Sequence, residues 1–174
     1  MKQFRWWLLA LLASAGLAVA GEAGIQTLDL DGLDQLEAPT ADASSGQPNA
    51  AQLETLAEKG FVAVIDLRGP GEDRGYEEPG AVEAAGLEYS PLPIAGADAV
   101  SVENARKLGE VLDSFDGPVL VHCGSGNRVG ALVALLEADR GASAEDALAA
   151  GRAAGLTSLE GLVRERLEMD DGGT

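Results

Sequence analysis

Cysteine and histidine are almost absent from this sequence, whose 174 residues contain one of each, Cys123 and His122. A chain with a single cysteine forms no internal disulfide. One cysteine and one histidine also provide no pair with the spacing of a zinc site. We therefore expect no metal and no cofactor, and the question becomes what the lone thiol does.

Basic residues are scarce as well, with 12 Lys and Arg against 29 Asp and Glu, which gives a formal net charge of -17. Nucleic acids and anionic membranes carry the same sign of charge, so neither is an expected partner. A local basic loop can still hold a small anionic or phosphorylated substrate within an acidic protein. No feature of the sequence indicates an oligomeric state.

Long hydrophobic runs are missing except at the start of the chain. Lys2 and Arg5 precede an apolar stretch from Trp6 to Leu17, and the small-x-small pattern Ala18-Val19-Ala20 follows. The stretch is short for a membrane span, and no stop-transfer charges follow it. We expect residues 1–20 to be a signal peptide cleaved after Ala20, which leaves an exported protein, periplasmic or secreted, without stable membrane association. An uncleaved anchor is the alternative.

The remaining chain is predicted to form one domain, because hydrophobic residues make up 46% of the sequence and suffice for a single core. Residues 21–44 are acidic and rich in small residues, and only Ile25 to Leu30 is strand-like. Ala38 to Pro48 is typical of a loop. The expected organisation is a flexible segment over 21–44, a domain over 45–168 and an acidic, frayed tail over 169–174.

Within that domain, apolar periodicity predicts alternating strands and helices. Asn49 and Gly60 are typical of the two ends of a helix. The strands are expected over 61–67, 87–92 and 119–122, and the helices over 50–59, 81–85, 101–115, 128–139, 143–155 and 158–169. Alternation with short connections favours a three-layer α/β/α fold with a mostly parallel sheet of four to five strands.

The segment His122-Cys123-Gly124-Ser125-Gly126-Asn127-Arg128 joins an expected strand to an expected helix. Ligands of parallel sheets bind beyond the carboxyl ends of the strands. Glycines let such a loop curl and turn its N–H groups inward, the helix N-terminus adds positive potential, and the Arg128 guanidinium can hold two oxygens of an anion. We expect the four residues between Cys123 and Arg128, namely Gly124, Ser125, Gly126 and Asn127, to bind the substrate.

The same positive potential favours the thiolate of Cys123, which makes this residue a candidate nucleophile. Strand alternation places the side chains of His122 and Cys123 on opposite sides of the sheet. His122 is therefore expected to brace the loop by hydrogen bonding rather than to accept a proton. An inert, buried cysteine in a glycine-rich turn is the alternative.

The pattern His-Cys-x-x-Gly-x-Arg after Gly117-Pro118-Val119-Leu120-Val121 resembles the cysteine-dependent phosphatases, and in particular the beta-lactamase-hydrolase-like phosphatase family, which is related to the dual-specificity phosphatases. The resemblance extends to Ser45–Pro48 with Leu53 and Leu56, to Val64–Arg68 and to Leu87–Pro93. It covers roughly residues 45–168 of the chain.

This resemblance implies a cysteine-phosphatase-like fold and hydrolysis of a phosphate ester through a phosphocysteine on Cys123, with Arg128 holding the phosphoryl oxygens and no metal. The family's general acid matches Asp98, although an acid at that place can also simply stabilise a helix N-terminus. Arg68 lies at the end of a neighbouring strand. We expect it to pair with Asp66, and a contact with the substrate is the alternative.

Two departures from the phosphatase pattern keep other functions open. The common phosphatase loop has five residues between Cys and Arg, whereas this chain has four, and Val129 stands where phosphatases often carry Ser or Thr. Four is also the spacing of many rhodanese-like sulfurtransferases, which carry a persulfide on the cysteine. A non-catalytic anion-binding domain is the third possibility. The helices expected over 143–155 and 158–169 favour the phosphatase, because a rhodanese-like chain would return to a strand there.

Overall fold

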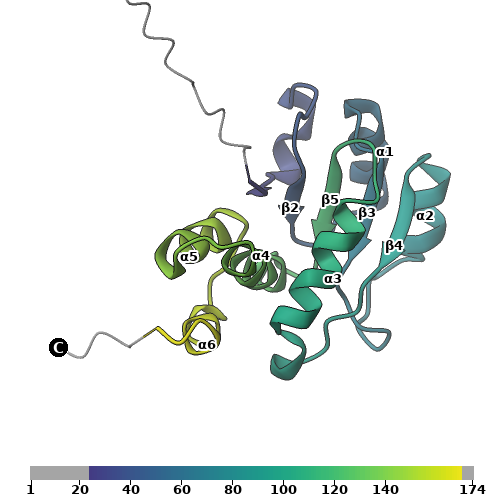
Figure 1. Ribbon diagram of the computed structural model, residues 1–174. Coiled ribbons are helices and arrows are strands. Elements are labelled where there is room, and N and C mark those ends of the chain that lie inside the picture. The colour runs from purple at the N-terminus through teal and green to yellow at the C-terminus, as the bar shows by residue number, and fades with distance from the viewer. Residues whose placement is uncertain (1–23, 170–174) are drawn as a thin grey trace, which may run out of the picture.

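The computed structural model describes residues 24–169, and the expected signal peptide over 1–20 lies outside them (Figure 1). The strands are β1 (Gln26–Thr27), β2 (Ala43–Ser45), β3 (Ala63–Asp66), β4 (Glu88–Pro91) and β5 (Val119–His122). The helices are α1 (Ala50–Lys59), α2 (Glu78–Ala84), α3 (Val102–Leu112), α4 (Asn127–Asp139), α5 (Ala144–Ala153) and α6 (Glu160–Arg166), with the 3-10 turns η1 (Leu30–Gln35) and η2 (Ala97–Ala99). Among residues 24–169, no helix has the length and apolar character needed to cross a membrane.

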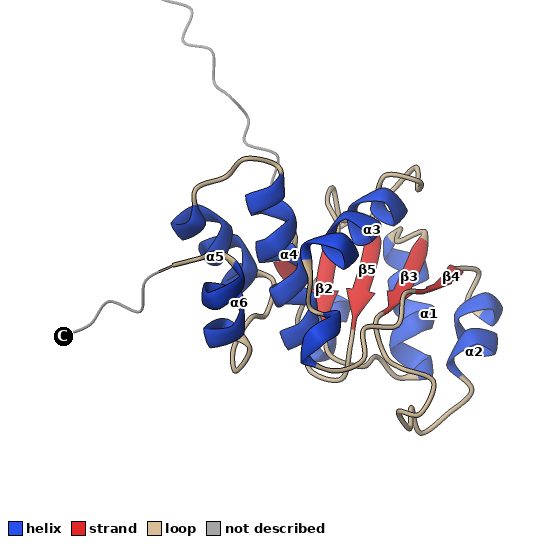
Figure 2. Ribbon diagram, turned by 60° about the horizontal axis from the view of Figure 1, so that its bottom comes forward, coloured by secondary structure: helices blue, strands red, loops and turns tan. Residues whose placement is uncertain are grey.

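The five strands form one sheet in the order β1-β2-β5-β3-β4, and every pairing is parallel. Helices α1 and α2 cover one face of the sheet, while α3 and α4 cover the other (Figure 2). Helices α5 and α6 pack on α4 and extend the structure sideways. The predicted α/β fold with a mostly parallel sheet is therefore confirmed.

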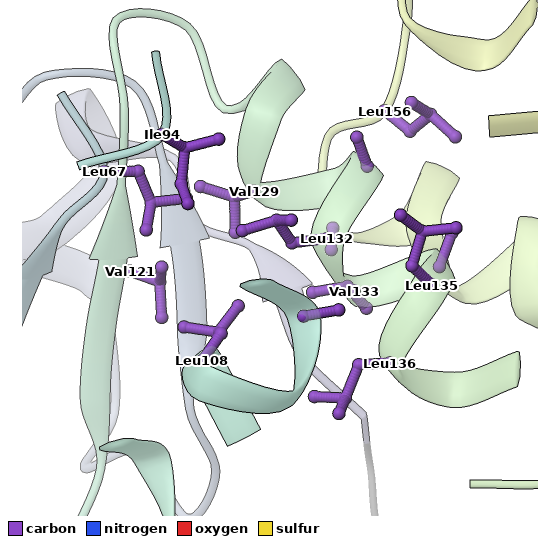
Figure 3. Packing of buried hydrophobic residues seen from close by; sticks show 14 of the residues in the cluster. Leu67, Ile94, Leu108, Val121, Val129, Leu132, Val133, Leu135, Leu136 and Leu156 are labelled. Atoms are coloured by element: carbon purple, nitrogen blue, oxygen red, sulfur yellow. The ribbon is translucent and has the colours of Figure 1, made fainter. Parts of the chain in front are cut away.

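Alternation along β3 and β5 divides the core into two clusters. Ile65 and Val121 belong to the cluster beneath α3 and α4, which Figure 3 shows, whereas Val64 and Leu120 belong to the cluster beneath α1 and α2. All four side chains are fully buried. Strands that bury both faces explain the nearly continuous apolar runs in the sequence.

Most predicted elements are present with small shifts at their ends. The Asn49 side chain caps α1 by accepting a hydrogen bond from the Gln52 N–H, and the Gln52 side-chain oxygen accepts one from the Asn49 N–H. Helix α2 begins three residues earlier than expected. Pro79 in its first turn suits that position because a helix start needs no N–H there.

The N-terminal segment differs from the expectation of a flexible stretch over 21–44. Its described part forms β1, η1 and β2, and β2 lies inside the sheet between β1 and β5. The sequence Ala43-Ser44-Ser45 has no apolar alternation, yet all three residues are buried. The backbone pairing with β1 and β5, rather than a hydrophobic pattern, therefore makes this segment a strand. Its three side chains are all small, so they carry no apolar signal in the sequence.

The four larger strands end at the same level. Ser45 of β2 and Asp66 of β3 both pair with His122 of β5, and Asp66 also pairs with Pro91 of β4. The connections that follow these strands consequently meet at one edge of the sheet, where Cys123 begins the loop into α4.

Candidate active site

The loop from Cys123 to Arg128 is held between β5 and α4. Cys123 is 1% exposed, and its N–H donates to the Ser45 carbonyl at 3.4 Å. Gly46 forms an isolated bridge with Ser125, and a Cβ on Gly46 would lie 3.3 Å from the Gly124 carbonyl oxygen. The connection after β2 therefore packs against the Cys123 loop. The two backbones approach so closely at Gly46 that a side chain there would crowd the loop.

The loop ends in a left-handed turn at Gly126, whose φ is 83° and which is the N-cap of α4. Residues other than glycine rarely adopt this conformation. Gly124 and Ser125 are exposed, whereas Gly126 is buried. The side chain of Asn127 bonds the Ser158 hydroxyl at 2.8 Å and accepts from the Thr157 N–H at 2.8 Å. This side chain holds the turn before α6, which leaves the backbone of Asn127 as its means of contacting a substrate.

Arg128 is fixed by a carboxylate that the sequence did not indicate. Its Nη1 and Nη2 donate to Oε1 and Oε2 of Glu72, each at 2.6 Å, and Nη1 also donates to the Ile94 carbonyl at 3.1 Å. The hydrogen bond from Arg128 lowers the pKa of Glu72 to about 2, so Glu72 is a carboxylate. The same bond raises the pKa of Arg128, to which the neighbouring Cys123 side chain contributes.

Two of the five N–H groups of Arg128 have no oxygen acceptor in residues 24–169, and the guanidinium also lies within hydrogen-bonding reach of the Cys123 side chain. Glu72 accepts one hydrogen bond from each terminal nitrogen, and Nη1 also donates to the Ile94 carbonyl at 3.1 Å and to the Leu67 carbonyl at 3.4 Å. Among residues 24–169, the Nε–H and the second Nη2–H form no hydrogen bond with an oxygen. These two groups lie on one edge of the guanidinium, which is the geometry that holds two oxygens of an anion.

Arg68 does not form the ion pair with Asp66 that the sequence suggested, so that expectation is wrong. Its side chain donates to the Gln47 side chain and to the Asp73 carbonyl, and its Nε lies 3.5 Å from Glu72. Its backbone N–H, at 2.8 Å from Asp66 Oδ1, closes a local turn. The cation that pairs with Asp66 is Arg74, at 2.5 Å, because the loop after β3 folds back over the strand end.

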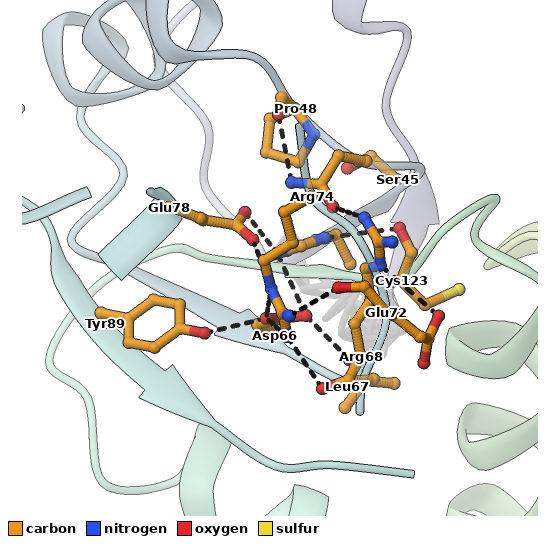
Figure 4. Close-up of polar contacts among 12 residues, drawn as sticks. Ser45, Pro48, Asp66, Leu67, Arg68, Glu72, Arg74, Glu78, Tyr89 and Cys123 are labelled. Carbon is orange, nitrogen blue, oxygen red and sulfur yellow. Dashed lines mark hydrogen bonds and ion pairs between the residues drawn. The ribbon is translucent and has the colours of Figure 1, made fainter. Parts of the chain in front are cut away.

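A buried polar cluster lies behind the loop, on the side of the sheet covered by α2. Asp66, Glu78 and His122 are each 0% exposed. Arg74 contacts both carboxylates, and the Tyr89 hydroxyl donates to Asp66 at 2.8 Å (Figure 4). Burial, followed by the bond to Asp66, raises the pKa of Tyr89. His122 faces this cluster, whereas Cys123 belongs to the opposite core beneath α3 and α4.

This cluster is also the one group of possible metal ligands in residues 24–169. One ligand atom from each of Asp66, Glu78 and His122 lies within 4.8 Å of the other two. Arg74 already places a positive charge on both carboxylates, however, at 2.5 and 3.2 Å. The donor set therefore fits an internal ion-pair network better than a metal.

Asp98 lies on η2 and is exposed. Among the described residues it forms no hydrogen bond or ion pair with Cys123 or Arg128, although Ile94, four residues before it, contacts Arg128 directly. Val129 is fully buried in the core, and its side chain has no hydroxyl that could assist the thiolate.

The sequence did not predict a role for Glu72, Arg74, Glu78 or Tyr89. Charged residues and a tyrosine in a charged loop and in its neighbouring elements match no motif.

Comparison with protein families gives a match over residues 28–165 to the family described as DSP-PTPase phosphatase fused to NAD+ kinase. The chain is 33% identical over 98 residues to the beta-lactamase hydrolase-like protein of Agrobacterium fabrum, and 34% identical over 99 residues to that of Xylella fastidiosa. These segments cover 54% and 55% of this chain but only 22% and 23% of the relatives. The chain thus spans less than a quarter of the length of these relatives.

Solved structures share the fold. A candidate phosphatase of Neisseria meningitidis Z2491 matches with a TM-score of 0.63 and 20% identity, over 75% of this chain and 96% of that one. Tk-PTP in a glycine-to-alanine mutant form matches with a TM-score of 0.55 and 25% identity, over 75% and 91%. A cysteine-to-serine variant of P. aeruginosa TpbA in complex with pTyr matches with a TM-score of 0.56 and 20% identity, over 88% and 99%.

Proposed function

The chain belongs to the family of DSP-PTPase phosphatases described as fused to NAD+ kinase, and on that premise we propose that it is an exported phosphatase that hydrolyses a phosphate ester through a phosphocysteine on Cys123. Phosphatases of this kind are hydrolases of phosphate esters. The observation that carries the proposal is the juxtaposition of the Cys123 and Arg128 side chains across a glycine-containing loop at the start of α4.

In the first proposed step the Cys123 thiolate attacks phosphorus, and the bond from phosphorus to the ester oxygen breaks. The two N–H groups that Arg128 retains hold two of the phosphoryl oxygens, and the loop amides face the others. The N-terminal end of α4 adds positive potential at the same place. Asp98 supplies a proton to the departing oxygen, provided that η2 moves toward the site.

In the second step a water molecule attacks phosphorus, the bond between sulfur and phosphorus breaks, and phosphate leaves. Asp98, deprotonated in the first step, accepts the proton of the water. The substrate is accordingly a small phosphorylated molecule or group, and the loop requires no metal ion for either step.

A sulfurtransferase is the second candidate, and the four-residue spacing between Cys123 and Arg128 favours it. The elements after the loop favour the phosphatase instead, since α4 is followed by α5 and α6 and, within the described residues, by no further strand. We therefore expect little transfer of sulfur from thiosulfate to cyanide.

The test is hydrolysis of an aryl phosphate by the purified protein, with mass spectrometry of the trapped enzyme. We expect phosphate release that is lost in Cys123→Ser and reduced strongly in Arg128→Lys, because a lysine cannot replace the paired N–H groups. Asp98→Asn should slow esters with poor leaving groups more than aryl phosphates, which need less protonation. Rapid sulfur transfer with a persulfide on Cys123, and no phosphate released, would reverse the assignment.

A further inference from the structure

The turn between α5 and α6 packs against the end of the Cys123 loop. Figure 1 shows both helices beside α4, which begins where the loop ends. Gly155 in this turn has a φ of 97°, a conformation that side chains disfavour, and a Cβ there would lie 3.2 Å from the Gly126 carbonyl oxygen. The backbone of the turn therefore lies directly against the last glycine of the loop.

The Asn127 side chain joins the loop to this turn with three hydrogen bonds. Its Oδ1 accepts from the backbone N–H of Thr157 at 2.8 Å and of Leu159 at 3.3 Å, and its Nδ2 donates to the Ser158 hydroxyl at 2.8 Å. An amide turned by half a rotation would place its own NH2 group against both N–H donors. The contacts at its oxygen and its nitrogen therefore hold the side chain in one orientation.

The backbone of Asn127 belongs to the proposed anion site. Asn127 and Arg128 are the first two residues of α4, and N–H groups in the first turn have no partner within their helix. Among residues 24–169, these two N–H groups donate to no backbone oxygen. A loop with four residues between cysteine and arginine offers one N–H fewer than the common phosphatase loop with five. The direction of each remaining N–H group therefore matters more for holding an anion.

We propose that Asn127 is a positioning residue, which uses the turn at 157–159 to hold the end of the Cys123 loop in the shape that binds an anion. Its side chain acts on its own backbone N–H and on that of Arg128, without touching the substrate. The helices α5 and α6 thereby complete the site from outside the sheet. The catalytic consequence rests on the proposed function, whereas the binding of a free anion needs no turnover.

Inorganic phosphate is the probe for this binding. Its affinity is measured as the concentration that halves the rate at which iodoacetamide alkylates Cys123, at constant ionic strength. Asn127→Ala removes all three hydrogen bonds and should raise that concentration roughly tenfold. Ser158→Ala removes one of the bonds at an exposed residue and should raise it about threefold. Ser158→Thr keeps the hydroxyl and should restore the affinity of the unmodified protein.

Ser143→Ala is the matched control, because Ser143 caps α5 through hydrogen bonds to Asp146. It should lower the Tm without changing the phosphate affinity. An unchanged affinity in Asn127→Ala, or an equal loss in Ser143→Ala, would overturn the proposal. If Asn127→Ala does not fold, equal affinities of Ser158→Ala and Ser158→Thr would overturn it instead.

Two further outcomes separate this proposal from the proposed function. The expected order of affinities in a protein that releases no phosphate from any ester would contradict only the proposed function. Phosphate that leaves the alkylation of Cys123 in the unmodified protein unchanged would overturn both, because the loop would then bind no anion.

Discussion

Glu72 determines how Arg128 is presented to a ligand. The carboxylate takes one hydrogen from each terminal nitrogen and leaves the edge that carries Nε–H free. Arg68 Nε lies 3.5 Å from the same carboxylate, so Glu72 contacts two arginines, Arg68 and Arg128. A planar pair of hydrogen bonds holds the long Arg128 side chain in one orientation. We therefore expect Glu72 to be important for turnover.

Glu72→Gln should therefore lower kcat for an aryl phosphate by about tenfold with a smaller change in KM. An amide accepts one of the two bonds and opposes the other with its own N–H groups, so the guanidinium loses its fixed orientation. Steady-state kinetics measure the effect, with Glu83→Gln as an exposed control. A rise in kcat would show that Glu72 restrains the site rather than orders it.

The same residue gives a prediction about pH and stability. The pKa of Glu72 is about 2 in the folded protein against a reference value of 4.5, so its pairing stabilises the fold fully above about pH 4.5 and is lost as the pH falls toward 2. The Tm difference between the unmodified protein and Glu72→Gln should be present at pH 7 and should shrink by pH 3. Thermal unfolding followed by circular dichroism measures both values. A difference that is independent of pH would argue against the ion pair as its source.

At the scale of secondary-structure elements, the contact between α4 and α5 fixes the direction of the helix that begins at the loop. Gly130 in the first turn of α4 meets the backbone of α5 and the residues after it. A Cβ at Gly130 would lie 2.1 Å from the Leu156 N and 2.5 Å from the Gly151 carbonyl oxygen. Both neighbours are backbone atoms, so a side-chain rotation cannot relieve the overlap.

Gly130→Ala should accordingly destabilise the protein by about 1–3 kcal/mol or more and reduce turnover, because α4 must shift and Arg128 shifts with it. Gly161→Ala is the matched control, since Gly161 is also helical and has no atom within 4 Å of a built Cβ. The control should be neutral or stabilising by about 0.5–1 kcal/mol. Denaturant unfolding of both variants decides the matter, and equal effects would contradict a close approach of α4 and α5.

At the scale of the whole molecule, the parallel strands bring four separate connections to one edge, and that edge carries the candidate site. The chain as a whole is strongly acidic, with a formal net charge of -17. Repulsion by this charge opposes the binding of polyanions, whereas the site that we propose at Arg128 and the loop amides takes one small anion. The proposal of export concerns the residues before 24, which the structure does not describe.

Expression with its own N-terminus in a bacterial host should release a chain that begins at Gly21. Two basic residues, a short apolar stretch and the Ala18-Val19-Ala20 pattern are the features that signal peptidase uses. Intact-mass spectrometry of the periplasmic fraction and of the medium measures the N-terminus. An Ala20→Leu variant, which removes the small residue before the cut, should remain uncut. Recovery of a chain that starts at Met1 in the membrane fraction would favour the uncleaved anchor.

The sequence by itself determined the class of fold and the position of the loop, because both depend on local patterns. Apolar patterns identified the helices and the strands β3, β4 and β5, and glycines beside Cys123 and Arg128 marked the turn between a strand and a helix. The resemblance carried by this loop agrees with the family match over residues 28–165.

Only the tertiary structure decided which residues surround the loop. Strand β2 is buried without an apolar pattern, and Arg74 rather than Arg68 reaches Asp66 across eight residues. Glu72 contacts Arg128 over a separation of 56 residues. Such contacts follow from how the strand ends align at one edge and from the path of the loop after β3. A single sequence carries no local signal for either, because charged residues in a loop are equally compatible with exposure to water.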